Sequence, residues 1–103
     1  MSTFNPNFSI AAGIAPAAIA AVATPLSVSV DPTSICRDVL VYNPGPAIVR
    51  IRAGASNVTA GATDMPILPG EKAVYFKGTA THISAICMAA GPQAMEFFPG
   101  VGE

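Results

Sequence analysis

Short apolar runs recur along this chain after Pro25, and turn sequences rich in proline or glycine separate them. Residues 26–31 alternate strictly between apolar and polar side chains, which is the period of a β-strand with one buried face. Strands at spacings of about 8 to 12 residues between such turns are typical of an antiparallel sandwich or a small barrel. The expected strands lie within residues 26–31, 36–42, 47–53, 65–68, 72–77, 82–88 and 94–98. We therefore predict an all-β fold, with a single antiparallel β-sandwich over residues 26–103.

The alternation within these strands also predicts which side chains face the core. In residues 72–77 we expect Val74 and Phe76 to point inward and Tyr75 to point outward. Pro66 lacks a backbone N–H, so residues 65–68 are expected to form an edge strand. Pro99 is expected to end the last strand and to protect an edge. The other residues expected to face the core are Leu26, Val28, Val30, Val49, Ile51 and Ala53.

The first 25 residues hold no charged side chain and are rich in alanine and proline. We expect residues 1–25 to form an extended arm outside the sandwich, in which residues 17–23 have the composition of a short helix. The apolar tract resembles a signal peptide but lacks the basic residues that precede one, and it is shorter than a bilayer span of roughly 20 residues. The arm is predicted to bind a groove on a partner, and the alternative is that its apolar side chains pack on their own domain. The residues expected to make these contacts are Phe4, Phe8, Ile10, Ile14 and Ile19.

The chain carries few charges. Charged residues make up 11% of it, with five basic and six acidic side chains and a net charge of −1 at pH 7. A typical globular domain has about 25% charged residues. Because non-specific binding to nucleic acids depends on a positive field, this balance argues against a nucleic-acid partner. Weak charge repulsion favours association, which indicates a subunit of an assembly.

Candidates for catalysis or metal binding are few. His82 is the only histidine, and no nucleophile-elbow sequence such as GxSxG accompanies it. We expect His82 to begin a strand and to form a hydrogen bond with a loop. The catalytic alternative is a triad of His82 with Asp64 and the hydroxyl of a serine or threonine. The acidic residues, Asp31 among them, fall at turns or on outward positions and are expected to be solvated, whereas Cys36 and Cys87 are expected to be buried free thiols. We therefore predict no enzyme activity, no cofactor, no metal ion and no small-molecule substrate.

Four segments carry a resemblance to a known class of proteins. Residues 41–51 read VYNPGPAIVRI, residues 57–60 read NVTA, residues 63–71 read TDMPILPGE and residues 78–86 read GTATHISAI. Together they resemble small virion proteins of tailed bacteriophages, over roughly residues 40 to 101, with the arm outside the match. Such proteins are β-sandwich or jelly-roll subunits, and several decorate or cement the outside of the capsid.

The resemblance implies a structural virion protein that stabilises the expanded shell by bridging capsomers. The implied partners are the major capsid protein and further copies of the chain, with no membrane contact, and the implied location is the capsid surface after assembly in the host cytoplasm. The first alternative is a head–tail connector, tail or spike component, and the second is a small carbohydrate-binding module, against which the absence of tryptophan argues. The residues expected at the interface of the domain are Tyr42, Ile48, Tyr75 and Phe98.

Overall fold

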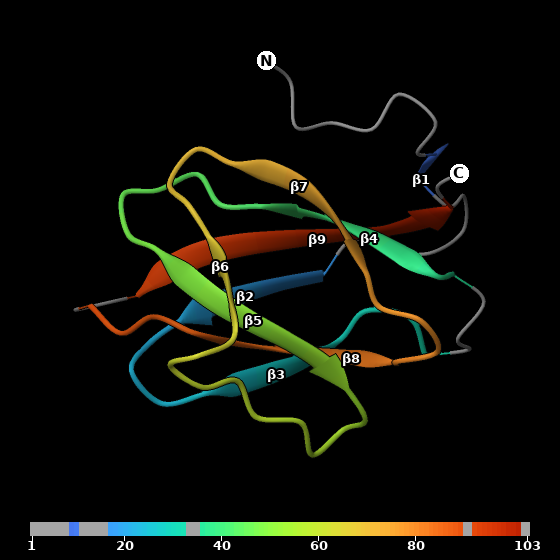
Figure 1. Cartoon of the computed structure of the whole chain (residues 1–103), viewed down its shortest axis with the longest axis horizontal. Helices are drawn as coiled ribbons and strands as arrows, with labels where there is room; N and C mark the ends of the chain where they lie inside the picture. Colours follow the sequence, from blue (N-terminus) through green and yellow to red (C-terminus); the bar gives the residue numbers. More distant parts are fainter. Residues whose placement is uncertain (1–8, 11–16, 33–35, 90–91, 102–103) are drawn as a thin grey trace.

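The computed structural model describes residues 9–10, 17–32, 36–89 and 92–101. Within these residues the protein has nine strands and no helix (Figure 1), which confirms the predicted all-β class. The strands are β1 (Ser9–Ile10), β2 (Ala17–Ala21), β3 (Leu26–Ser29), β4 (Asp38–Tyr42), β5 (Val49–Gly54), β6 (Met65–Ile67), β7 (Lys72–Phe76), β8 (His82–Ile86) and β9 (Gln93–Val101).

The strands form two antiparallel sheets that share one core. The first sheet has the order β1-β9-β4-β7, and β2 also pairs with β9. The second sheet has the order β3-β8-β5-β6. Side chains of both sheets meet in a single buried cluster, among them Val39 and Phe97 of the first sheet and Ile51 and Ile83 of the second. Two antiparallel sheets packed on a common core are the arrangement of a β-sandwich.

The pairs of strands are nested along the chain. β5 pairs with β6, β4 with β7, β3 with β8 and β2 with β9, so the pairs enclose one another in sequence. Successive pairs alternate between the two sheets. The chain therefore crosses from one sheet to the other between β2 and β3, between β3 and β4, between β4 and β5, and again on its way back.

The predicted faces hold for β5 and fail for β7. Val49 and Ile51 are buried as expected, whereas Leu26, which begins the edge strand β3, is 42% exposed and does not fill the core as predicted. In β7 the alternation is reversed: Tyr75 packs against the core and Phe76 is 69% exposed. Tyr75 is the partner of the buried Val39 in the register of β4, and cross-strand partners share a face of the sheet. The buried face of this strand includes the charged residue Lys77, which is two residues after Tyr75. The prediction for Val74 and Phe76 was wrong because a lysine was expected to face solvent.

The expected arm contains a strand of the sandwich. Ala17–Ala21 forms the strand β2 and not a helix, because its pairing with residues 93–97 of β9 overrides the helix propensity of alanine. Ile19 is buried in the core of its own chain, so the partner contact expected for this residue is wrong and the alternative, packing on its own domain, holds for it. The backbone of Ile10 pairs with Gly100 in β1. Phe4, Phe8 and Ile14, and the side chain of Ile10, lie outside the described residues.

The two prolines behave differently. Pro66 lies in the edge strand β6, as predicted. Pro99 neither ends β9 nor protects an edge, because β9 continues to Val101 between β4 on one side and β1 and β2 on the other. β2 pairs with β9 up to Phe97 and β1 pairs from Gly100 onward, so Pro99 falls in the interval where neither needs a hydrogen-bond donor.

Candidate functional site

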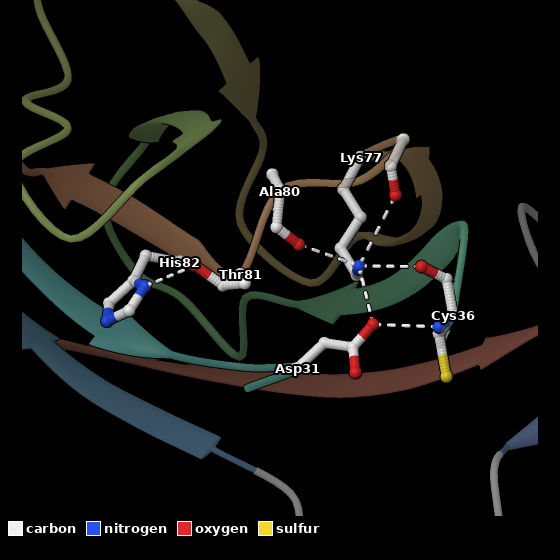
Figure 2. A network of polar contacts seen from close by, with 7 residues as sticks. Asp31, Cys36, Lys77, Ala80, Thr81 and His82 are labelled. Atoms are coloured by element: carbon white, nitrogen blue, oxygen red, sulfur yellow. Dashed lines mark hydrogen bonds and ion pairs between the residues drawn. The ribbon is translucent and has the colours of Figure 1, made fainter. Parts of the chain in front are cut away.

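A buried ion pair joins Asp31 and Lys77 at one end of the sandwich (Figure 2). Lys77 Nζ lies 2.8 Å from Asp31 Oδ2, and both side chains are 0% exposed. Lys77 Nζ also donates hydrogen bonds to the backbone oxygens of Cys36, at 2.7 Å, and Ala80, at 2.8 Å. With a longer contact of 3.5 Å to the backbone oxygen of Gly78, these acceptors are enough for the three N–H groups of an ammonium ion. All the hydrogen-bond donors of the Lys77 side chain are therefore satisfied within the network.

This network ties together two connections that cross between the sheets. Asp31 follows β3 and Cys36 precedes β4, while Lys77 and Ala80 lie between β7 and β8. The backbone N–H of Cys36 donates to Asp31 Oδ2 at 2.8 Å, and the N–H groups of Val30 and Asp31 donate to the backbone oxygen of Thr81. The expectation that Asp31 is solvated was wrong, because the local sequence does not reveal that a lysine 46 residues away shares its pocket.

The cysteines are buried free thiols, as predicted. Burial and the neighbouring Asp31 carboxylate raise the pKa of the Cys36 thiol, against an opposing effect of Lys77. A raised pKa keeps the thiol protonated near neutral pH, and the thiolate is the reactive form. Cys36 therefore contributes its backbone to the network and not its sulfur.

His82 begins β8, and its Nδ1 lies 2.8 Å from Thr81 Oγ1. Asp64, the acid of the alternative triad, instead pairs with Arg52 at 2.9 Å and accepts a hydrogen bond from the N–H of Gly61. Burial opposes the charged form of Asp64, but the Gly61 N–H and the Arg52 guanidinium outweigh it and lower the pKa of this carboxyl. The structure thus places His82 and Asp64 in separate interactions.

Exposed apolar side chains gather at the end of the sandwich where β5 begins. Ile48, which precedes β5, is 45% exposed. Extending the registers of β5 with its two neighbours sets Leu68, 50% exposed, on one side of Ile48 and Met88, 58% exposed, on the other. Ile48 and Met88 line a shallow hollow, which we call the end hollow; its other lining residues are Pro46, Ala47, Arg50, Pro69 and Ala89.

The rim of the end hollow is held by the buried side chain of Asn43. Its Nδ2 donates to the backbone oxygens of Ala47, at 2.8 Å, and Ile67, at 2.9 Å, and its Oδ1 accepts from the N–H of Gly45. Gly45 has a φ of 90°, a backbone conformation that residues other than glycine rarely adopt. Because one side chain fixes two loops, the hollow is a preformed feature of the surface.

The four residues expected at a domain interface do not share one surface. Ile48 lines the end hollow, and Tyr42 and Phe98 are half-buried on the outer face of the β9-β4-β7 sheet. Tyr75 faces the core and not the outer surface, where it was expected to contact a partner. Phe76 is exposed although the alternation of residues 72–77 predicted that it faces the core.

Among the described residues, no three His, Cys, Asp or Glu side chains come close enough together to hold a metal ion. The same residues form no helix that is long and apolar enough to cross a membrane. Comparison of the chain with known protein families, with curated protein sequences and with solved structures gives no match.

Proposed function

We propose that this protein is a structural virion protein, a decoration or cement subunit that binds the outside of a bacteriophage head and associates with further copies of itself. Its partner is the major capsid protein, and its contribution is interface area and not catalysis. Binding to the expanded shell alone would stabilise that state by mass action.

The observation that carries the proposal is the nested pairing of eight consecutive strands. β2–β9, β3–β8, β4–β7 and β5–β6 alternate between the two sheets, which supports a jelly-roll fold. Jelly rolls recur in viral capsid domains and in lectins. Since a fold alone does not fix a function, the resemblance of residues 40–101 to small virion proteins favours the first of these classes.

The end hollow supports a contact with a larger partner. Leu68, Ile48 and Met88 present apolar surface in one row, and among the described residues that line the hollow only Arg50 is charged. Contiguous apolar surface rimmed by polar residues marks an interaction site on a soluble protein. In this proposal the hollow receives an apolar side chain of the capsid protein.

The test of the proposal is the number of copies per purified virion, measured by quantitative mass spectrometry against the major capsid protein. Copies on the order of hundreds support symmetric coverage of the shell. About a dozen copies or fewer would place the protein at a vertex, neck or tail. Absence from the particle would overturn the proposal and leave a carbohydrate-binding module as the reading to test, on a glycan array.

The contact itself is tested by binding of purified variants to capsids that lack the protein. Met88→Ser removes apolar surface from the end hollow and is expected to weaken binding roughly tenfold. Met65→Ser is the matched control, because Met65 is also exposed, at 42%, but does not line the hollow. Equal binding by the two variants would rule out the hollow as the contact.

A further inference from the structure

Among the strands that the structure describes, β7 lies at an edge of its sheet. In the order β1-β9-β4-β7, and within the described residues, β7 has β4 on one side and no strand on the other (Figure 1). Natural sheet proteins protect such edges with prolines, charges or very short strands. β6, the neighbouring edge of the other sheet, has three residues and contains Pro66. β7 has five residues, and its only charge is Lys72 at its start.

The hydrogen bonds between β4 and β7 show which backbone groups face this open edge. The N–H of Asn43 donates to the oxygen of Glu71, and the N–H of Lys77 donates to the oxygen of Arg37. In an antiparallel ladder, hydrogen-bonded pairs alternate with pairs that do not exchange hydrogen bonds. Ala73 and Tyr75 therefore bond to β4, and the backbone groups of Lys72, Val74 and Phe76 point away from it.

We propose that two copies of this protein pair through β7, antiparallel and about a two-fold axis at Val74. In this register Val74 faces Val74 of the second copy, and Lys72 faces Phe76 of the second copy. All three are hydrogen-bonded pairs, so every edge-facing N–H and C=O of β7 finds a partner. The proposal rests on the self-association named in the proposed function and gives that association its interface.

The side chains fit the same register. Lys72, Val74 and Phe76 lie on the outer face of the sheet, beside Tyr42, Leu40 and Asp38 respectively. Pairing sets the stem of Lys72 against Phe76 of the second copy, which is the most exposed of the large apolar side chains described. No two lysines face each other, which would be destabilising.

The charges along the resulting row are complementary. Within one copy the row runs from Glu96 through Tyr42 to Lys72, whose Nζ lies 5.3 Å from the centroid of the Tyr42 ring. Across the two-fold axis it continues through Phe76 to Asp38 of the second copy. Each Lys72 cation therefore lies between a carboxylate of its own chain and one of its partner.

The test is the oligomeric state of the full chain, measured by sedimentation equilibrium over a range of concentrations. Val74→Pro removes the N–H at the two-fold axis and leaves the bonds from Ala73 and Tyr75 to β4 in place. Both copies lose a donor, so dimerisation is expected to weaken roughly 30-fold. Val74→Thr keeps the N–H and the branched shape and is expected to dimerise like the wild type. A monomeric wild type, or a Val74→Pro variant as dimeric as the wild type, would overturn the proposal.

Hydrogen exchange of the wild type gives a second measurement that needs no variant. Raising the concentration is expected to slow exchange at the amides of Lys72, Val74 and Phe76 and to leave those of β3 unchanged. Slowing confined to β3 or β6 would refute the β7 interface. Copy number in virions separates the two proposals, because dimerisation through β7 without incorporation into particles contradicts only the proposed function.

Discussion

Removing the charge of Lys77 is expected to cost a large part of the stability of the sandwich. Lys77→Met keeps the length of the side chain but leaves the Asp31 carboxylate buried without its cation. Asp31 and Lys77 are both fully buried, so no solvent screening reduces the effect. Breaking a buried ion pair by removing one partner costs about 3–5 kcal/mol.

This loss compares with a total stability of about 5–15 kcal/mol for a domain. The backbone oxygens of Cys36 and Ala80 also lose the donor that Lys77 provides. Asp31→Asn combined with Lys77→Met removes both charges and keeps an oxygen for the N–H of Cys36. We expect the double variant to be about 2 kcal/mol more stable than Lys77→Met alone, because no uncompensated charge remains.

Equilibrium unfolding in urea measures both effects. With a slope of about 2 kcal/mol per molar urea, Lys77→Met is expected to lower the midpoint by about 2 M. Arg37→Met is the matched control, since Arg37 follows Cys36 of the network but is exposed, and its midpoint should change by less than about 0.3 M. A Lys77→Met variant within about 1 kcal/mol of the wild type, or a double variant less stable than the single one, would refute the argument.

Three further outcomes are expected. Asn43→Ala leaves the backbone oxygens of Ala47 and Ile67 without their donor. The variant should melt roughly 10–20 °C lower in a calorimetric scan. A change under about 4 °C would contradict the role of Asn43. Arg52→Ala should raise the pKa of Asp64 in an NMR titration. Because the folded protein lowers this pKa, the pair stabilises the fold at pH values above the pKa of an unfolded carboxyl, and the stabilisation is lost as the pH falls through the pKa of folded Asp64. The stabilisation is less than about 1 kcal/mol because Arg52 is exposed. Native Cys36 should resist a chromogenic disulfide reagent near neutral pH and react after unfolding, and rapid reaction in the native state would show that the thiol is neither buried nor protonated.

The strand positions were predictable from the sequence because turn residues and alternation act locally. Proline and glycine end each run, and Val49 and Ile51 alternate with two arginines, so the buried face of β5 follows from the sequence alone. The face of β7 did not follow, because it depends on the pairing of Tyr75 with Val39 and on a long-range ion pair at Lys77. Local hydrophobicity cannot reveal either interaction.

The pairing of β2 and the residues of the end hollow also could not be predicted from the local sequence. The sequence Ala17–Ala21 favours a helix, and only β9, more than 70 residues later, supplies the edge that makes it a strand. Leu68, Ile48 and Met88 lie in one row only through the registers of three strands. The exposure of Ile48 was predictable from the sequence, but its position between Leu68 and Met88 was not.

The nested pairing also has a consequence for how the chain is made. β9 supplies the hydrogen-bonding partners of β1, β2 and β4, yet it is synthesised after every other strand that the structure describes. Until Phe97 and its neighbours have been synthesised, β2 has no partner and the core cluster lacks its largest buried side chain. Pairings of such long sequence separation close late and slowly. The sandwich therefore forms only once β9 has been synthesised, and a nascent chain stalled before β9 would expose strand edges to its neighbours on the same messenger.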